Sequence, residues 1–210
     1  FLEENPPAGI CGAQLTYGDG SFQHGAFQFP SLAQVLLDLF PLPSVRGMHR
    51  VHDSGINGRY PTSRWQGQEP FEVDFVLGAA LMVRAEAIRE VGDLDDAYFM
   101  YCEEMDWCLR MADGGWPVYA LPAARVIHHA GQSSGQVRWP AFERLWRSRL
   151  RFFEKHPNHY SIIDIMMFRF AIRTSMRLRA AAAYRRFAAG KISGVQLGEE
   201  LSAYEAVSKM

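Results

Sequence analysis

Hydrophobic residues recur at every second position in several short runs of the chain, a pattern that is typical of half-buried strands. We predict strands over residues 10–15, 22–29, 71–83, 117–120 and 124–129. The residues from Tyr17 to Gly20 lie between the first two runs and supply turn chemistry, which favours a hairpin. Gly78 and Ala79 interrupt the third run, and a glycine within a strand often marks the close approach of another backbone or of a ligand.

Other segments repeat their apolar residues every three to four positions, which predicts helices. These helices cover residues 31–39, 84–91, 103–113, 139–153 and 161–189. Up to residue 137 short helices alternate with strands, and this order predicts an α/β sheet whose ligand sites lie beyond the carboxyl ends of strands. Asp164 and Arg169 leave the last helix short of the ~18 consecutive apolar residues that a spanning helix needs, so we predict that it does not cross a bilayer.

The composition is that of a globular protein, with 210 residues of which 48% are hydrophobic and 21% charged. Three cysteines without a CxxC spacing argue against a disulfide framework or a cysteine zinc site and favour packed thiols in a reducing compartment. The chain starts at Phe1 in the middle of a pattern, from which we expect that an upstream part precedes it.

A net charge of -1 hides two parts of opposite charge. Residues 138–191 hold 13 Lys/Arg against three acids, whereas the remainder holds 9 against 20, and such asymmetry points to an anionic surface as partner. Arg169, Arg173 and Arg177 stand four residues apart and form a cationic stripe beside apolar neighbours, as in a helix at a membrane interface. A helix that packs on the sheet with solvated arginines explains the same pattern equally well.

Carboxylates gather where an aromatic segment leads into the helix predicted at residues 103–113. Glu103 and Asp106 share a helix face, and Asp106 precedes Arg110 by four positions, the spacing of a favourable ion pair. Acids in a first turn also offset the positive end of the helix dipole. A structural role on the helix surface therefore accounts for the cluster without any chemistry.

His128 and His129 follow each other at the end of the last predicted strand. A histidine at this place is often a hydrogen-bonded structural residue, and it can also be a ligand. Two histidines without a third group specify no metal. The pair alone thus assigns no site.

The order of the motifs is more informative than any one of them. The series comprises Gly78-Ala79 followed by Arg84, Val91 to Asp95, Phe99 to Arg110, Gly115-Trp116, and Val126 to Ser133. It resembles the second half of the catalytic domain of inverting family 2 glycosyltransferases, especially the rhamnosyltransferase-like branch. The resemblance is specific over about sixty residues and looser from Ile10 to Pro30.

The resemblance implies a fold and a division of the chain. The fold is α/β, the C-terminal part of a GT-A (Rossmann-like) glycosyltransferase domain with appended C-terminal helices. We expect residues 1–137 to form a partial GT-A catalytic domain that lacks its N-terminal nucleotide-binding part. Residues 138–210 are then a basic amphipathic helical tail.

The resemblance also implies roles for single residues. An acceptor alcohol is a poor nucleophile, so a carboxylate must take its proton as the new bond forms. Glu104 stands where the family has its catalytic aspartate and is the expected general base, with Glu103 and Asp106 positioning the acceptor or orienting the base. His128 is the expected ligand of the metal or of the diphosphate. The expected substrate contacts are Gly78, Ala79, Arg84 and Trp107.

The implied cofactor is a divalent cation, Mg²⁺ or Mn²⁺, which offsets the charge of the departing diphosphate. The family's Asp-x-Asp metal motif is missing, because Asp93 and Asp95 belong to the Val-Gly-Asp-Leu-Asp turn. We therefore expect the chain alone to be inactive.

The resemblance also implies partners and a location. The expected donor is a nucleoside-diphosphate sugar, and the expected acceptor is a glycan or a polyprenyl-diphosphate-linked glycan of cell-envelope or exopolysaccharide synthesis. The expected location is the cytoplasm, either free or peripheral on the inner face of the plasma membrane. The basic tail is the part that would meet an anionic membrane surface.

Two other functions fit parts of the pattern. A transferase half without its metal motif would act as an interaction module. A nucleic-acid-binding protein would use the aromatic residues that interleave with arginine as a stacking platform. These aromatic residues are Trp139, Phe142, Trp146, Phe152 and Phe153. They follow helical spacing and no reader motif is present, so we predict that they are core residues and expect no nucleic acid partner.

Overall fold

The computed structural model describes residues 1–41, 51, 54–131 and 137–210. These residues form two compact units, a sheet unit and a helical unit. The sheet unit holds residues 1–34, 103–130 and the described part of 42–98, and the helical unit holds residues 35–41, 99–102 and the described part of 131–210. Gln132 and Ser133, the last residues of the motif series, lie outside the described residues.

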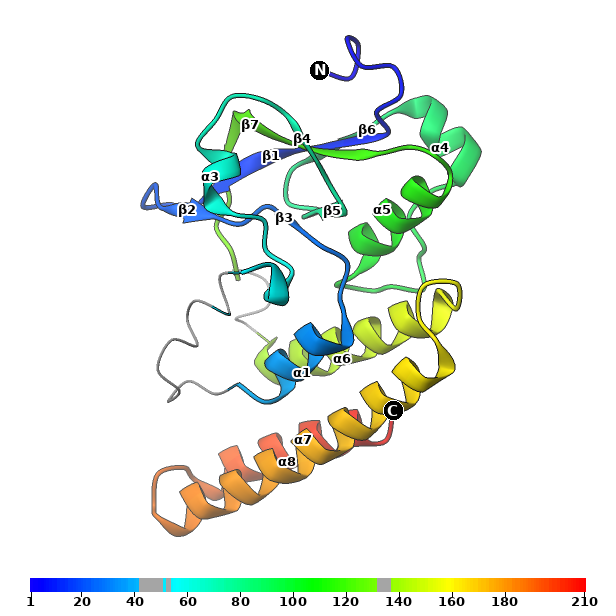
Figure 1. Ribbon diagram of the computed structural model, residues 1–210. Coiled ribbons are helices and arrows are strands. Elements are labelled where there is room, and N and C mark those ends of the chain that lie inside the picture. Colours follow the sequence, from blue (N-terminus) through cyan, green and yellow to red (C-terminus); the bar gives the residue numbers. More distant parts are fainter. Residues whose placement is uncertain (42–50, 52–53, 132–136) are drawn as a thin grey trace. The chain divides into compact units, whose positions relative to one another are not determined.

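The sheet unit is built around β1 (Ile10–Thr16), the central strand of a five-stranded sheet (Figure 1). β7 (Val118–Ile127) runs parallel to β1 along one edge, and β4 (Phe71–Val73) pairs antiparallel with β7. The other edge of β1 is shared by β6 (Leu81–Val83), which pairs with its first half, and β2 (Phe22–Gln23), which pairs with its second half. The predicted mixed α/β class is confirmed.

A second, two-stranded sheet and short helices complete this unit. β3 (Ala26–Phe27) pairs antiparallel with β5 (Phe75–Val76), and α5 (Glu103–Asp113) packs against β5 and β7. α4 (Ala85–Val91) ends at Gly92, as predicted. A 3₁₀ turn, η1 (Gly55–Asn57), and a short helix, α3 (Thr62–Trp65), lie between β3 and β4 in the chain. The core between sheet and helices includes Ile10, Trp65, Phe71, Val76, Trp107, Met111 and Val118.

The strand predicted over residues 71–83 is broken into β4, β5 and β6, each with a different partner strand. The first break lies at Asp74, whose carboxylate accepts from the amide of Phe29 at 2.7 Å and from the hydroxyl of Tyr60 at 3.0 Å. Because Asp74 uses its side chain to join separate segments, it does not continue the ladder. Alternation of apolar residues alone carries no signal for such a long-range contact.

The run predicted over residues 22–29 also divides, into β2 and β3. Gly25 lies between them, and a Cβ at this position would be 3.0 Å from the carbonyl oxygen of Ala13. The chain therefore crosses closely over β1 at a point where only glycine fits without displacement. The predicted hairpin between β1 and β2 is present, closed by a hydrogen bond from the amide of Tyr17 to the carbonyl of Ser21.

The two strands predicted on either side of Pro122 are one strand, β7. Its pairing with β1 is irregular, since Ala13 faces Leu121 whereas the next residue, Gln14, faces Arg125. Proline has no backbone N–H to donate, so the extra residues after Leu121 bulge out of the ladder. His128 follows the end of β7, and all three cysteines of the chain are buried thiols, as predicted.

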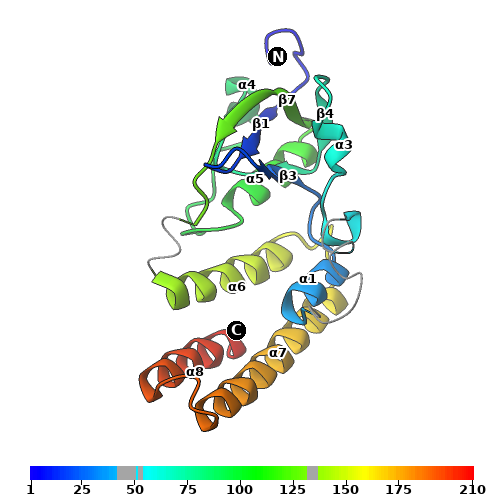
Figure 2. The same cartoon turned by 90° about the vertical axis from the view of Figure 1, so that its left-hand side faces the viewer.

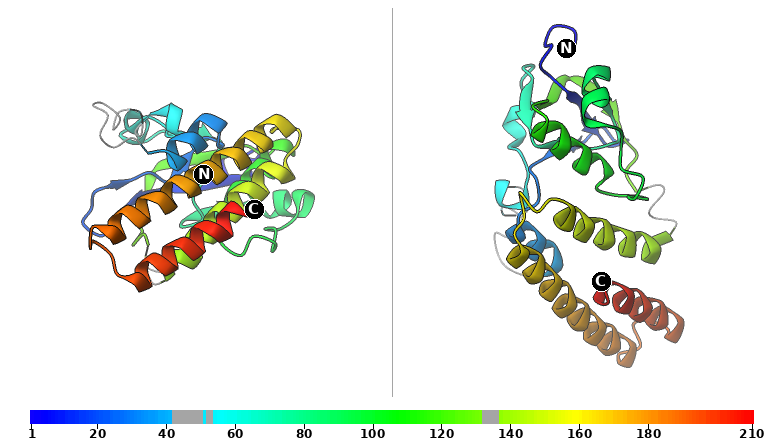
Figure 3. Two further views of the ribbon diagram at one scale, coloured as in Figure 1. Left: turned by 90° about the horizontal axis from the view of Figure 1, so that it is seen from below. Right: turned by 90° about the vertical axis from the view of Figure 1, so that its right-hand side faces the viewer.

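The helical unit contains α6 (Arg138–Lys155), α7 (Ile162–Ala188) and α8 (Gly194–Ser208), together with most of α1 (Leu32–Leu39). α7 is the longest of them, with 27 residues (Figure 2). It lies side by side with α8 (Figure 3). Ser161 and Ser193 start α7 and α8 with capping boxes. None of the helices in the described ranges combines the length and the apolarity that a bilayer crossing demands.

Aromatic side chains form the core of the helical unit. Trp146, Phe152 and Phe153 of α6 are buried, and Phe153 stacks near Tyr160 at a centroid distance of 4.2 Å and near Phe168 at 4.8 Å. Three of the five rings that could serve as a stacking platform for bases are therefore covered by their own unit. The prediction that these rings are core residues is confirmed for Trp146, Phe152 and Phe153, whereas Trp139 and Phe142 are half-buried.

Candidate active site

Glu104 lies in the first turn of α5, next to the turn that follows β5. The amide of Gly78 donates to its Oε1 at 3.4 Å, while Oε2 is buried and accepts no hydrogen bond from any residue that the structure describes. Burial, and after it the charge of Glu103, raises the pKa of Glu104, although nearby backbone amides act in the opposite direction. A carboxylate with a raised pKa and an unused oxygen is suited to take up a proton.

Gly78 and Ala79 are exposed beside this carboxylate. A Cβ at Gly78 would lie 3.7 Å from the Cβ of Glu104, which is an ordinary contact, and Gly78 does not adopt the left-handed backbone that favours glycine. Packing among the described residues thus does not require glycine at position 78. The close approach of a ligand to this exposed backbone stays a prediction.

Two strained residues precede α5. Tyr101 and Cys102 have φ angles of 69° and 66°, in the left-handed region that costs a side-chain-bearing residue roughly 1–2 kcal/mol. Such strain is concentrated at functional sites, because the surrounding structure must hold it in place. Sequence reasoning missed this feature, since neither residue is the glycine or asparagine that usually marks a left-handed turn.

Asp106 is fully buried, with an exposed fraction of 0%. The predicted ion pair is present, because Arg110 Nε donates to Asp106 Oδ2 at 2.8 Å, and the hydroxyl of Tyr98 donates to Oδ1 at 3.4 Å. Arg110 also donates to the carbonyls of Val91 and Asp93. The expected place on the helix surface is wrong, since this network fastens α5 from inside to the loop that follows α4. These contacts place Asp106 to orient the helix.

Glu103 and Trp107 have different surroundings although they lie one turn apart. Glu103 is half-buried, and its Oε2 has no hydrogen-bond partner within the described residues. Trp107 is 7% exposed and belongs to the core, and its indole N–H donates to the carbonyl of Gly92 at 2.8 Å. The structure thus gives Trp107 a packing role in place of the expected substrate contact.

Arg84 lies at the opposite end of β1 from His128. Its guanidinium donates to the backbone carbonyls of Leu2, Asn5 and Ala8, so it anchors the N-terminal segment. The amide of His128 instead donates to the carbonyl of Thr16, the last residue of β1. At ~3.3 Å per residue a seven-residue strand separates the two ends by roughly 20 Å. Arg84 therefore does not lie near His128.

The imidazole of His128 is half-buried against Gln23, with Nδ1 at 3.1 Å from Gln23 Nε2 and at 3.2 Å from Oε1. His129 is exposed, and its ring packs over Gly18, where a Cβ would lie 2.8 Å from the ring. Over the described ranges, no three His, Cys, Asp or Glu side chains come close enough together to hold a metal ion. His128 alone does not make up the expected cation site.

A short line of backbone and side-chain contacts connects His128 with Glu104. Gln23 contacts His128 and precedes Gly25 by two positions, and the carbonyl of Gly25 accepts from the amide of Leu77 at 2.9 Å. The residue after Leu77 is the one whose amide donates to Glu104. His128 thus contacts Gln23, which precedes this segment, and Glu104 is connected to Gly25 through Gly78 and Leu77.

Comparison with known proteins gives several rhamnosyltransferases. N-acetylglucosaminyl-diphospho-decaprenol L-rhamnosyltransferase of Mycobacterium tuberculosis (strain ATCC 25618 / H37Rv) is 33% identical over 139 residues, which cover 62% of this chain and 40% of that protein. Rhamnosyltransferase WbbL of Escherichia coli (strain K12) is 32% identical over 83 residues, 40% of this chain and 31% of that protein. The chain is similar to rhamnosyltransferases.

A third relative and the lengths of all three define how far this similarity extends. dTDP-rhamnosyl transferase RfbF of Shigella flexneri is 26% identical over 104 residues, which cover 47% of this chain and 35% of that protein. No family model matches the chain. The chain spans less than half the length of these curated relatives, so the similarity concerns one part of each. The motif series indicated a resemblance to rhamnosyltransferases, and this resemblance is confirmed.

Proposed function

We propose that the chain is the acceptor-side part of an inverting family 2 glycosyltransferase with a GT-A fold. The reaction transfers a sugar from a nucleoside diphosphate to a hydroxyl group of a glycan or lipid-linked acceptor in cell-envelope or exopolysaccharide synthesis. The observation that carries the proposal is Glu104, a carboxylate of raised pKa with one oxygen held by a backbone amide and the other unused. The similarity to three rhamnosyltransferases supports it.

In the proposed reaction Glu104 acts as the general base. The acceptor hydroxyl attacks the anomeric carbon from the face opposite the diphosphate, the new C–O bond forms, and the bond to the leaving diphosphate breaks. The hydroxyl proton passes to Glu104, where burial favours the protonated carboxyl. Gly78 holds Oε1, which leaves Oε2 for the acceptor. Asp106 and the strained pair Tyr101-Cys102 are positioning residues in this scheme.

His128 is the proposed contact of the diphosphate. In the tautomer in which Gln23 Nε2 donates to Nδ1, the ring proton is on Nε2, which can donate it to a phosphoryl oxygen. A divalent cation would offset the charge of the leaving group. The described residues do not fit this cation by themselves, because they bring together no ligand cluster, and we derive no step through it.

An anionic membrane surface is the proposed partner of the helical unit. The first half of α7 exposes large apolar side chains at positions that recur on one helix face. They are Ile162 at 68%, Ile163 at 64%, Met166 at 64%, Met167 at 48% and Phe170 at 71% exposure. Arg173 and Arg177 are exposed on the following turns, whereas Arg169 pairs with Glu154. An apolar face followed by cations suits the boundary between headgroups and acyl chains.

Vesicle co-sedimentation tests the membrane proposal. We expect the chain to sediment with vesicles that contain anionic lipid and to stay in solution with neutral vesicles. Phe170→Glu should abolish sedimentation, while Val195→Glu, an equally exposed apolar position on α8, should leave it unchanged. Binding that ignores lipid charge, or that survives Phe170→Glu, contradicts the proposal.

A chimera tests the catalytic proposal. The region of the Mycobacterium tuberculosis rhamnosyltransferase that matches this chain is replaced by the corresponding residues of this chain, and transfer of rhamnose is measured. We expect activity, and we expect Glu104→Gln to lower kcat by about 10²- to 10⁴-fold, the usual contribution of a general base. Glu86→Gln is the matched control, because Glu86 also stands second in its helix but is exposed.

Two outcomes would overturn the proposal. A folded chimera that transfers no sugar supports the alternative, an inactive transferase half that serves as an interaction module, and full activity of Glu104→Gln excludes Glu104 as the base. If the chimera does not fold, carboxyl NMR titration of the 210-residue chain decides, and an ordinary pKa at Glu104 contradicts the site. The chain alone is predicted not to transfer sugar, which a direct assay with dTDP-rhamnose checks.

A further inference from the structure

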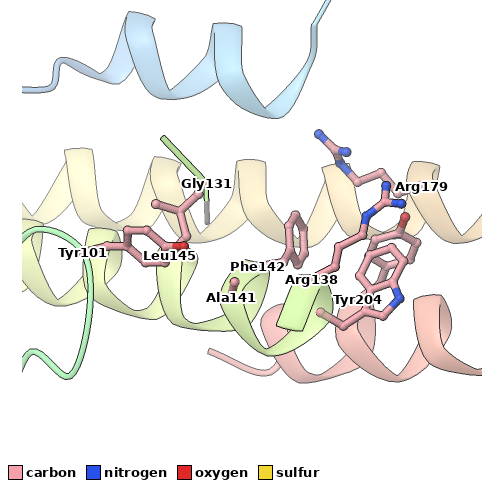
Figure 4. A pocket seen from close by; sticks show the side chains of 9 residues that line it. Tyr101, Gly131, Arg138, Ala141, Phe142, Leu145, Arg179 and Tyr204 are labelled. Atoms are coloured by element: carbon pink, nitrogen blue, oxygen red, sulfur yellow. The ribbon is translucent and has the colours of Figure 1, made fainter. Parts of the chain in front are cut away.

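The helical unit contains a pocket of about 410 Å³ that the proposed reaction does not use (Figure 4). Arg138, Trp139 and Phe142 of α6 line it together with Arg179 of α7 and Tyr204 of α8. Figure 4 shows the arginines and Tyr204 toward one end of the pocket and Tyr101 and Leu145 toward the other. One end is thus cationic and the other apolar.

Neither arginine of the pocket has a carboxylate partner among the residues that the structure describes. The guanidinium of Arg138 lies over the ring of Trp139 at 4.9 Å from the centroid. Arg179 donates to two neutral acceptors, Ser175 Oγ and the carbonyl of Leu39, each at 3.3 Å. Two guanidinium groups at one pocket without a paired acid favour an anionic ligand, and phosphoryl oxygens match their donor geometry.

The start of α6 adds a second source of positive potential. Arg138 and Trp139 are its first two residues, and Val137 at the N-cap position accepts no hydrogen bond through its side chain. The amides of Arg138 and Trp139 therefore lack a side-chain cap, although Pro140 after them has no amide hydrogen, and the positive end of the dipole of this 18-residue helix lies at Arg138, which lines the pocket. An uncapped helix start beside two arginines is a suitable place for a phosphate.

The acid that contacts Tyr204 is already paired with another arginine. Glu200 pairs with Arg186 at 2.5 Å and accepts from the hydroxyl of Tyr204 at 3.2 Å. Burial, and after it the charge of Glu200, raises the pKa of Tyr204, so its hydroxyl stays protonated. The carboxylate is thus already engaged away from Arg138.

The apolar wall consists of edge-to-face aromatic rings. Tyr204 contacts Trp139 at a centroid distance of 5.7 Å and Phe142 at 6.0 Å, and Leu145 and Ala141 continue the wall along α6. Such a surface gains free energy by covering hydrocarbon. A simple anion such as phosphate would not cover this apolar wall, which would then stay exposed to water.

We propose that this pocket binds a phosphoryl-bearing amphiphile, with the phosphate or diphosphate at Arg138 and Arg179 and the adjoining hydrocarbon along the rings. The site lies within the helical unit and does not depend on Glu104. The identification of the ligand with a lipid-diphosphate acceptor rests on the proposed function, whereas the binding chemistry rests on the pocket alone. The volume suits the diphosphate and the first part of a hydrocarbon chain.

Calorimetry on the 210-residue chain tests the proposal with soluble probes. Farnesyl diphosphate should bind at one site, about tenfold more tightly than inorganic pyrophosphate, because methylene burial adds to the phosphoryl contacts. Arg138→Gln should weaken farnesyl diphosphate about tenfold or more, the usual effect of losing a charged hydrogen bond. Arg185→Gln is the matched control, since Arg185 is exposed on α7 and does not line the pocket.

The probes separate the possible occupants. Equal affinity for pyrophosphate and farnesyl diphosphate, tighter binding of dTDP than of farnesyl diphosphate, or an unchanged affinity in Arg138→Gln overturns the proposal. Arg138 is exposed, so its variant is expected to fold, and a thermal melt verifies this. Glu104 does not line the pocket and is tested by the turnover of the chimera, so that failure of the pocket and failure of the catalytic proposal are distinguishable.

Discussion

α4 and α5 each carry a glutamate as their second residue, and the two glutamates have opposite properties. Glu86 of α4 is exposed and pairs with Arg89 at 2.7 Å, and its own backbone amide and this arginine lower its pKa. Glu104 of α5 is half-buried next to Glu103, and its pKa is raised. The same residue at the same helix position becomes a solvated ion in one place and a candidate base in the other.

The difference arises from what surrounds each helix start. α4 follows Arg84, whose φ of -70° is ordinary extended backbone, and its first two residues, Ala85 and Glu86, are exposed. α5 follows two left-handed residues, and the backbone of Gly78 lies next to its first turn. The backbone path and the neighbouring turn, and not the residue type, distinguish the site from an ordinary helix cap.

The comparison of α4 with α5 predicts its largest effect on the free energy of unfolding, at Asp106 of α5. Asp106→Ala should lower the free energy of unfolding by about 3–5 kcal/mol, because it leaves the guanidinium of Arg110 without its buried partner. Glu86→Ala, which removes an exposed pair, should change it far less. Urea unfolding measures both, and similar values for the two variants would show that the α5 network is not structural.

The backbone strain before α5 is tested by comparing the stabilities of glycine and alanine variants at a residue that precedes each helix. We expect a smaller effect than at Asp106, with opposite signs at the two helices. At Tyr101, glycine should be more stable than alanine by about 1–2 kcal/mol, because alanine must pay the left-handed penalty. At Arg84, before α4, glycine should be less stable than alanine by roughly 0.5–1 kcal/mol. Each pair of variants removes the same side chain, so the difference isolates the backbone. A preference for alanine at both positions would exclude strain before α5.

The smallest effect is a pH dependence. Between the unfolded pKa of a glutamate and the raised folded pKa of Glu104, the folded state binds more protons, so stability falls as pH rises through this range. Glu104→Gln should therefore stabilise the chain by about 1 kcal/mol at pH 7 and have little effect below pH ~4. Glu86→Gln should have the opposite sign, with a small loss at pH 7 that disappears in acid, since its folded pKa is lowered. Thermal melts across pH distinguish the two signs.

Much of the local structure could be predicted from the sequence. The bounds of α5 at Glu103 and Asp113 are as predicted, because the apolar period is clear and glycines follow it. The division of residues 71–83 could not be predicted, since Asp74 bonds to groups that are distant in the chain. The apolar pattern of a segment indicates whether it forms a helix or a strand, but it does not indicate which distant residues the segment contacts.

The candidate site was predicted in part. The motif order singled out Glu104 and Gly78, and the structure places them in contact. It gives three other predicted site residues different surroundings, because their polar groups are used inside the protein. Arg84 holds backbone carbonyls, Trp107 packs in the core, and Asp106 is buried with Arg110.

The sequence by itself determined the α/β class, the helices that start at Glu103 and Ser161, and the candidate base, since each depends on residues that are close together in the chain. Only the tertiary structure decided that Glu104 has a raised pKa while Glu86 has a lowered one. It also decided that Arg138 and Arg179 face one pocket. Burial and charge proximity act between residues far apart in the chain, and such distances exist only after the chain has folded.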